Sequence, residues 1–593
     1  MKDRTFGWVQ NPSDFQSLQH TVQIFDPESD HYARLRDQLV PSYIPNEGVR
    51  DSLQAKLNKG EAVFTYEELV GHSRDANNRP AKSRAVAVAD ALIQVSIPSQ
   101  QAQTNNKYWT DNWTADGFLR WAVSLNFVQF DRDTDEYTIS PLGTELAQVA
   151  TEPARDEILK KAFLRYPPAT RVLSILAGAA ENGHPWKNKF EIGHELGFLG
   201  EPGFTSYNSS LMLGFLKQAS TSKEVTTIRA DVEGTADKYA RMIAMWLIKV
   251  GFVETRSPKI AHRILGPVGG FMEYRITGAG LHAIRQAQGS SKNNRAAKFV
   301  MWEFFATTGK SRGYVRTRRA RIVQLLMATP TKSFDRLVEQ LHAESLTDDP
   351  AIITNDLCGL NHMGIRVYFV SGGSQGRQVQ LRDTIQPFTI PTGQLTQSQG
   401  DKAREQLKAK FLAKTNLLPR YVELLDIAYD SKRNRDFEMV TAELFNFAYL
   451  LPAVHLGGVR KPDALVATKK FGIIVDTKAY ANGYSRNANQ ADEMARYITE
   501  NQKRDPKTNP NRWWDNFDAR IPPNAYYFLW VSSFFTGQFD DQLSYTAHRT
   551  NTHGGALNVE QLLIGANMIQ TGQLDRNKLP EYMQDKEITF GTI

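Results

Sequence analysis

Three charged residues near the C-terminus have the types and spacing of a metal-dependent phosphodiesterase. Asp463 follows a proline, and thirteen positions later Asp476 and Lys478 end the apolar run at 472–475. Side chains two apart on a strand share a face, so Asp476 and Lys478 project together and a hairpin can bring Asp463 beside them. Paired carboxylates suit a hard divalent ion, and a nearby ammonium can stabilise charge on an attacked phosphate. The pattern therefore indicates hydrolysis of phosphodiesters.

A simpler interpretation exists for each of these residues. Asp-x-Lys occurs by chance in long chains, where charged strand ends are usually solvated. The run at 472–475 argues against chance, because a strand buried on both faces should not end in a carboxylate and a lysine without reason. Glu438 or Glu443 could add a carboxylate from a helix upstream. A charged residue on the wet side of an amphipathic helix is the simpler interpretation for both.

The surrounding elements must form a domain that positions these side chains. Strands are expected at Asp463, at Asp476 and in the apolar segment 525–531. We predict helices at the segments 420–429, 436–449, 490–503 and 558–570. A central sheet flanked by helices, with acidic residues at strand ends, is typical of an α/β nuclease core.

Length and composition limit the classes of protein. A chain of 593 residues exceeds one hydrophobic core, so about three to five domains are expected. Apolar residues make up 41% of the chain and charged residues 23%, as in ordinary globular proteins. No apolar run approaches bilayer length, and the N-terminus lacks the apolar stretch of a signal peptide. The single cysteine, Cys358, excludes an internal disulfide and predicts a reducing, cytoplasmic compartment.

The chain is basic, with a net charge of +7 and a pI near 9.1. This charge is compatible with a polyanionic partner without requiring one. Five arginines gather between positions 312 and 321, and no acidic residue alternates with them. Such a run differs from a solvated helix face, where the sign of charge normally alternates. Contact with phosphates and pairing between domains both remain open for this cluster.

Two segments in the first two-thirds of the chain repeat one pattern. The element Tyr-x-Ile-Ser/Thr-x-x-Gly occurs at 137–143 and again at 274–280, in each case after an amphipathic helix. These helices are expected to begin near Thr114 and Thr235. A helix followed by a hairpin is typical of a winged helix-turn-helix, whose hairpin loop is the wing. A third, weaker copy spans 321–389, with a helix at 354–362 and strands at 363–370 and 378–381.

The first two units carry residues suited to reading DNA. The segment 107–114 is rich in aromatic and amide side chains. Glu233, Lys238 and Arg241 are expected at the start of the second helix, where they can accept from cytosine or donate to guanine. The third unit lacks such residues and suits packing or regulation. Tandem winged helices can also form a protein–protein scaffold.

Between the repeats and the C-terminal domain the sequence becomes polar and is typical of a loop, and a charged helix is expected at 401–414. The predicted divisions are three winged-helix-like subdomains, a linker and a nuclease domain, at 1–150, 151–290, 291–390, 391–419 and 420–593.

Several longer motifs resemble the FokI family of type IIS restriction endonucleases, nearly from end to end. They lie at 4–12, 111–113, 117–121, 237–242, 455–458, 475–480 and 490–494. The resemblance implies a multidomain α+β fold, in which three tandem winged-helix-like DNA-recognition subdomains precede an α/β PD-(D/E)xK restriction-endonuclease-like cleavage domain. It also implies that the cleavage domain is held in reserve until it pairs with a second copy.

The resemblance assigns roles to individual positions. Asp463, Asp476 and Thr477 would hold Mg²⁺, with Lys478 as the catalytic lysine beside the two aspartates. The implied DNA contacts are Gln10, Asn11, Arg84, Gln100 and Trp113 in the first subdomain and Glu233, Lys238 and Arg241 in the second. Asp492 and Arg496, otherwise an ordinary intrahelical pair, would meet across a dimer axis. The match fails at 230–232, which leaves the target sequence open.

The predicted function is that of a type IIS restriction endonuclease. It would bind an asymmetric site in double-stranded DNA and, after its cleavage domains form a transient homodimer, cut both strands at a fixed distance with Mg²⁺. A cognate DNA methyltransferase is expected in the same system, and no membrane partner. The alternatives are a DNA-binding regulator with an inactive nuclease-like domain and a strand-specific nicking nuclease. The complete set Asp463, Asp476 and Lys478 argues against the regulator.

Overall fold

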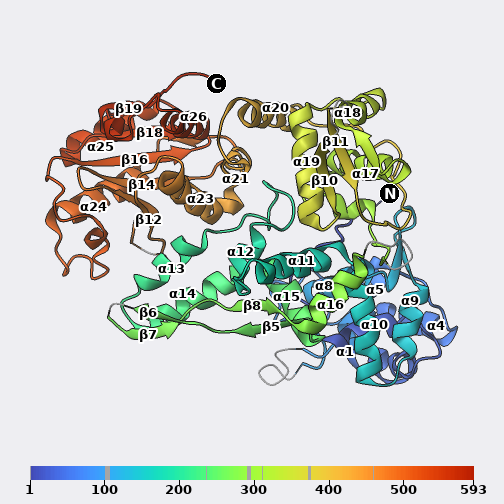
Figure 1. The fold of residues 1–593 in the computed structure, drawn as a ribbon. Coiled ribbons are helices and arrows are strands. Elements are labelled where there is room, and N and C mark those ends of the chain that lie inside the picture. The colour runs from blue at the N-terminus through green and yellow to red at the C-terminus, as the bar shows by residue number, and fades with distance from the viewer. Residues whose placement is uncertain are drawn as a thin grey trace.

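The computed structural model describes residues 2–99, 107–235, 237–262, 264–289, 295–309, 311–371, 376–458 and 460–593. Figure 1 shows the chain from the first subdomain in blue, through the green and yellow second and third subdomains, to the C-terminal domain in orange and red. In the described ranges no helix is long and apolar enough to cross a bilayer.

The N-terminal part contains three units, each built on a three-stranded antiparallel sheet. In each unit a short strand precedes the helices, and a hairpin follows them. The strands and main helices of the first unit are β1 (Phe64–Thr65), α5 (Tyr66–Val70), α8 (Asn112–Ser124), β2 (Val128–Asp131) and β3 (Glu136–Ile139). Those of the second are β4 (Lys187–Asn188), α12 (Lys189–Gly193), α15 (Lys238–Lys249), β5 (Val253–Arg256) and β8 (Glu273–Ile276). Those of the third are β9 (Thr331–Ser333), α18 (Phe334–Ala343), α19 (Pro350–Met363), β10 (Val367–Ser371) and β11 (Arg377–Leu381).

The repeated sequence element has the same structure in both copies. Ser140 accepts a hydrogen bond from the Gly143 amide at 2.9 Å, and Thr277 accepts one from the Gly280 amide at 3.1 Å. Each hydroxyl caps the helix that follows: α9 (Pro141–Gln148) and α16 (Gly278–Ala287). A Cβ on either glycine would lie about 2 Å from a backbone oxygen of the preceding turn. The glycines are therefore required by this close approach.

The second unit differs from the prediction in its middle. Two helices, α13 (Ser209–Lys217) and α14 (Ser222–Thr235), are inserted between α12 and α15. Asp237, with φ of +47° in the left-handed region, separates α14 from α15. Glu233 therefore belongs to the end of α14 and does not start the recognition helix, whereas Lys238 and Arg241 lie in the first turn of α15. The wing of this unit is the hairpin β6 (Lys259–His262) and β7 (Gly266–Gly269).

The C-terminal domain is built on a six-stranded mixed sheet in the order β12-β13-β14-β16-β18-β19. The first three strands are antiparallel, and β16, β18 and β19 extend the sheet in parallel from β14. Their bounds are β12 (Ala453–His455), β13 (Ala464–Ala467), β14 (Gly472–Lys478), β16 (Tyr526–Ser532), β18 (Gly554–Asn558) and β19 (Lys586–Glu587). The predicted nuclease core, a sheet between helices, is confirmed.

Helices cover both faces of this sheet, as Figure 1 shows. Ile473 and Val475 pack toward α23 (Asn434–Phe447) and α26 (Val559–Gln570). Ile474 packs toward α24 (Ala488–Lys503) and α25 (Phe539–Thr550) on the other face. This alternation explains why β14 reads as a continuous apolar run. The helix expected at 420–429 is two short helices, α21 (Pro419–Val422) and α22 (Leu424–Ile427).

The predicted charged helix exists as α20 (Gln399–Lys414). One face of it joins the C-terminal domain, because Phe411 is fully buried in that domain's core. Lys408 of α20 also forms an ion pair with Asp426 of α22 at 2.6 Å. Other side chains of α20 contact the third N-terminal unit, as described below.

Candidate active site and DNA-reading elements

The β13–β14 hairpin brings the predicted catalytic residues together. Ala464 pairs with Val475 across the antiparallel hairpin, which places Asp463 opposite Asp476 and within reach of Thr477. The carboxylate Oδ2 of Asp463 accepts from the Thr477 amide at 2.7 Å and from the Thr477 Oγ1 at 3.0 Å. Lys478 Nζ lies 2.8 Å from Oδ2 of Asp476. One edge of the sheet therefore gathers two carboxylates, one hydroxyl and one ammonium group.

The two carboxylates are electrostatically unfavourable neighbours. Burial raises the pKa of Asp463 well above its usual range, and the charges of Asp476 and then Glu438 add to this effect. Burial also raises the pKa of Asp476, against the opposing influence of Lys478. Burial disfavours the charged form of Lys478, but Asp476 and Asp463 outweigh it and raise the pKa of that ammonium. Two carboxylates and one ammonium group leave an excess of negative charge when both carboxylates are ionised. A divalent cation would neutralise that excess.

Few side chains are placed to coordinate a metal ion at this site. Over the described part of the chain, no three acidic, histidine or cysteine side chains converge closely enough to enclose a metal ion. Mg²⁺ commonly binds through one or two carboxylates and fills its other positions with water and substrate phosphates. Asp463 and Asp476, with an oxygen of Thr477, match that kind of site.

Two residues near the site, Glu438 and His455, were not assigned to it from the sequence. Glu438 of α23 lies toward Asp463, and its Oε2 is 3.2 Å from Nε2 of His455. Glu443 instead pairs with Arg420 at 2.6 Å and takes no part in the site. His455 was not predicted, although the tight turn at Gly457 was a signal. A Cβ at Gly457 would lie 2.8 Å from the His455 ring.

The residues expected to contact DNA in the first unit lie near the start of α8 and in the N-terminal segment. Trp113 is 52% exposed in the first turn of α8. The guanidinium of Arg84 lies 5.5 Å from the centre of its ring. Asn11 is exposed, and Gln10 is half-buried and hydrogen-bonded to Tyr239 of α15. Gln100 falls outside the described residues.

In the second unit, Lys238 and Arg241 are partly exposed at the start of α15, as a reading helix requires. Glu233 is different. Its carboxylate lies 3.5 Å from the buried Lys189 and accepts from the Met272 amide at 3.4 Å. Glu233 is thus engaged inside the unit, where it supports the junction of α14 and α15.

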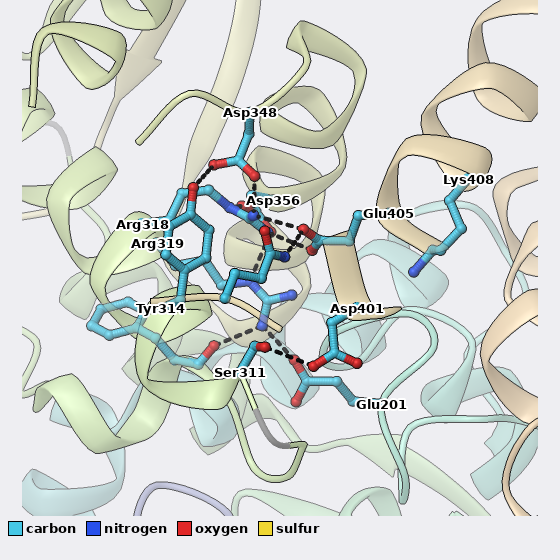
Figure 2. A network of polar contacts seen from close by, with 12 residues as sticks. Glu201, Ser311, Tyr314, Arg318, Arg319, Asp348, Asp356, Asp401, Glu405 and Lys408 are labelled. Carbon is cyan, nitrogen blue, oxygen red and sulfur yellow. Dashed lines mark hydrogen bonds and ion pairs between the residues drawn. The ribbon is translucent and has the colours of Figure 1, made fainter. Parts of the chain in front are cut away.

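The arginine cluster pairs protein carboxylates. It lies on α17 (Arg312–Ala328), and Figure 2 shows its buried members among acidic residues from three parts of the chain. Arg318 bonds to Asp356 at 2.6 Å and to Glu405 of α20 at 3.1 Å. Arg319 bonds to Asp356 at 2.7 Å and also pairs with Glu201 of the second unit. Of the two alternatives left open, pairing between domains is confirmed for these arginines, whose guanidinium groups are occupied by carboxylates.

Asp492 and Arg496 do not form the intrahelical pair that was the alternative to a dimer contact. Asp492 pairs with Arg549 of α25, and Arg496 lies 3.2 Å from Glu493. Both side chains stay exposed on α24, with 60% and 40% of their surface accessible.

Known proteins match this chain along nearly its whole length. Four sequence models of FokI match in order: recognition domain subdomain 1 at residues 4–149, subdomain 2 at 155–291, the D3 domain at 305–372 and the cleavage domain at 399–589. The type II restriction enzyme FokI of Planomicrobium okeanokoites is 37% identical over 599 residues, covering 99% of this chain and all of the relative. The chain belongs to the FokI family of type II restriction enzymes.

Further members of the family agree with this assignment. The type II restriction enzyme StsI of Streptococcus sanguinis is 27% identical over 619 residues, covering all of this chain and 96% of StsI. The solved structure of FokI matches with a TM-score of 0.88, and that of FokI bound to DNA with 0.90. Both are 36% identical to the chain, covering 99% of it and 100% of the solved chain. The predicted architecture, recognition subdomains followed by a cleavage domain, is confirmed.

Proposed function

We propose that this protein is a type IIS restriction endonuclease. It binds an asymmetric site in double-stranded DNA with its N-terminal units and hydrolyses both strands at a fixed distance from the site. The observation that carries this proposal is the convergence of Asp463, Asp476 and Lys478 on one sheet edge, in a domain separate from the DNA-reading helices. The names of its relatives, type II restriction enzymes, and a FokI structure bound to DNA support the same conclusion.

The site residues divide the chemistry between them. Asp463 and Asp476, with Thr477, would hold Mg²⁺, which supplies Lewis acidity and a more acidic bound water. Thr477 orients Asp463 through two hydrogen bonds. Lys478, held at 2.8 Å by Asp476, presents its ammonium to the phosphate and stabilises the charge that develops there.

The separation of reading from cutting follows from the domain order. Lys238 and Arg241 of α15 would read base edges in the major groove, and Gln10, Asn11, Arg84, Gln100 and Trp113 would contact DNA from the first unit. None of these residues belongs to the catalytic domain. We propose the divisions 1–150, 151–290 and 291–390 for reading, with 420–593 for cutting.

A double-strand break requires two catalytic sites in opposite orientation. One set of Asp463, Asp476 and Lys478 hydrolyses one strand, and a two-fold dimer supplies the second set most simply. Asp492 and Arg496 are exposed on α24, where each can exchange its present partner for one on a second copy. We place the dimer contact there, formed on DNA and absent from the free monomer.

The biological setting follows from the proposed activity. An enzyme that cuts a short site would destroy its own host's DNA, so a cognate methyltransferase must protect the same site. The single cysteine suits the reducing cytoplasm, where the DNA lies.

One digestion tests the proposal. Plasmid DNA is incubated with the protein and Mg²⁺, and the ends are sequenced. We expect linear product with both strands cut at constant offsets from one asymmetric sequence, and a rate that rises more than linearly with protein concentration. Nicked circles alone would indicate a strand-specific nicking enzyme, and binding without any cut would indicate a regulator.

A further inference from the structure

The chain keeps the alternating pattern of β14 for two residues beyond the end of the strand at Lys478. Ala479 is buried in the core that lies toward α23 and α26. The next residue, Tyr480, stacks on Tyr484, which is buried in the opposite core with residues of α24 and α25. Side chains two apart on an extended chain share a face. Tyr480 therefore projects from the same face of the sheet as Asp476 and Lys478.

Tyr480 is held firmly and is still open to solvent. Its carbonyl accepts a hydrogen bond at 2.6 Å from the Oγ of Ser533, which follows β16 directly. Its ring lies 6.0 Å from the ring of Tyr484, with planes 25° from parallel, and Tyr484 in turn packs on Phe539 of α25 with centroids 5.0 Å apart. Tyr480 is 37% exposed, and none of the described residues forms a hydrogen bond with its hydroxyl. The ring is thus placed in advance and carries a free donor.

The position of this hydroxyl suits a contact with DNA next to the cut. Residues two apart on an extended strand are separated by roughly 6.5 Å. Neighbouring phosphates of one DNA strand are separated by a similar distance, and a tyrosine hydroxyl reaches about as far from the backbone as a lysine ammonium. When Lys478 meets the phosphate that is cut, the Tyr480 hydroxyl can therefore reach the next phosphate of the same strand. Tyrosine hydroxyls are among the groups that bind DNA phosphates.

We propose that Tyr480 is a substrate-binding residue of the cleavage domain, whose hydroxyl donates a hydrogen bond to the phosphate next to the one that is cut. With two neighbouring phosphates fixed, the strand is aligned on Lys478 and the two aspartates before the reaction begins. The contact reads no base, which suits a domain that cuts outside the recognised sequence. This inference rests on the proposed nuclease function.

The test uses the full-length protein with Mg²⁺ and a DNA duplex that contains the site found by digestion. Single-turnover rates at saturating protein are compared for wild type and Tyr480→Phe, which keeps the ring and removes the hydroxyl. We expect Tyr480→Phe to cut about tenfold more slowly, the lower end of what a hydrogen bond to a charged group contributes. Tyr582→Phe is the matched control and should cut as wild type does. Tyr582 lies in the same domain but packs on Phe590 against the core on the opposite face of the sheet.

Modified DNA assigns the loss to a phosphate contact, by the logic of a double-mutant cycle. In two further duplexes, a neutral methylphosphonate replaces the phosphate on one side or on the other side of the scissile phosphate in the labelled strand. On one of these duplexes wild type and Tyr480→Phe should cut at equal rates, because the charge that the hydroxyl meets is gone. On the other duplex the tenfold difference should persist. A loss caused by altered packing would be the same on all three duplexes.

The outcomes separate this inference from the proposed function. Equal rates for Tyr480→Phe and wild type on unmodified DNA, or a difference that neither methylphosphonate removes, would overturn the inference and leave the proposed function intact. Undiminished cleavage by Asp476→Ala in the same assay would instead overturn the proposed active site, and the inference with it.

Discussion

Asp463 accepts two hydrogen bonds from Thr477, one from the backbone amide and one from the side-chain hydroxyl. Thr477 lies between Asp476 and Lys478, so the strand that carries two of the proposed catalytic groups also orients the third, Asp463. Thr477 is 5% exposed, and valine would fill the same space without donating a hydrogen bond to Asp463.

We therefore expect Thr477→Val to slow cleavage about 10- to 100-fold, the effect of removing a hydrogen bond that orients a metal ligand. Binding of the DNA site should be unchanged, because Thr477 belongs to the C-terminal domain and the proposed reading helices belong to the N-terminal units. Thr477→Ser keeps the donor and is the matched control. Single-turnover rates of the three proteins measure the effect, and equal rates for valine and serine would show that the hydroxyl has no role.

The second prediction concerns base choice. Lys238→Ala and Arg241→Ala should each relax specificity at one position of the site, by about 1–3 kcal/mol against the wrong base. Arg285→Ala, an exposed residue of α16 that pairs with Glu181, serves as the control. Selection from a random DNA library followed by sequencing measures the preference. A uniform loss of affinity for all sequences would show that α15 does not read bases.

The third prediction concerns the arginine cluster. Arg318→Met leaves Asp356, Asp348 and Glu405 without their shared cation in a buried place, which typically costs about 3–5 kcal/mol. We expect a lower melting temperature and an unchanged salt dependence of DNA binding. Arg321→Met removes only a partly exposed pair with Glu344 and should cost about 0–1 kcal/mol. If Arg318→Met were stable and flattened the salt dependence, the cluster would contact phosphates.

Features set by neighbouring residues were predictable from the sequence, whereas contacts between distant segments were not. The convergence of Asp463, Asp476 and Lys478 was predictable because strand periodicity is local. The repeat at Tyr137 and Tyr274 was predictable because each copy carries its own helix cap and glycine. The partners of Arg318 were not predictable, since Glu405 lies 87 positions away. The position of Glu233 was not predictable either. It lies in the inserted helix α14, where its carboxylate contacts Lys189, a residue distant in the sequence. The contact between the rings of Phe215 on α13 and His455 on β12 joins two domains and left no local signal.

The fourth prediction concerns pH. Glu423 of the cleavage domain accepts from the Gly200 amide of the second unit at 3.1 Å and is 2% exposed. Burial raises its pKa from 4.5 to about 7, although Arg420 and Arg433 oppose this. A raised pKa means that the docked state, in which the cleavage domain contacts the second unit, holds the proton more tightly than the undocked one. Docking should therefore be strongest below pH 4.5 and weaken by up to about 3 kcal/mol as the pH rises through 7.

Glu423→Gln imitates the protonated form and should remove this dependence on pH. The measurement is small-angle scattering of the free protein at pH 5.5, 7 and 8.5, in which undocking enlarges the radius of gyration. Glu581→Gln, an exposed residue of the same domain, should behave as wild type. A wild-type radius that is constant over this range, or a variant that still expands with pH, would contradict the role of Glu423.

The proposed function requires that Asp463, Asp476 and Lys478 form the site that cuts DNA. It is tested most directly by single-turnover digestion of a labelled DNA site with Mg²⁺, comparing wild type with Asp476→Ala at matched occupancy of the DNA. We predict that the variant binds the site as wild type does and cuts at least about a thousandfold more slowly, roughly 4 kcal/mol of lost transition-state stabilisation. A chelator should stop the wild-type reaction. Cleavage by Asp476→Ala at the wild-type offsets and at a comparable rate would contradict the assignment.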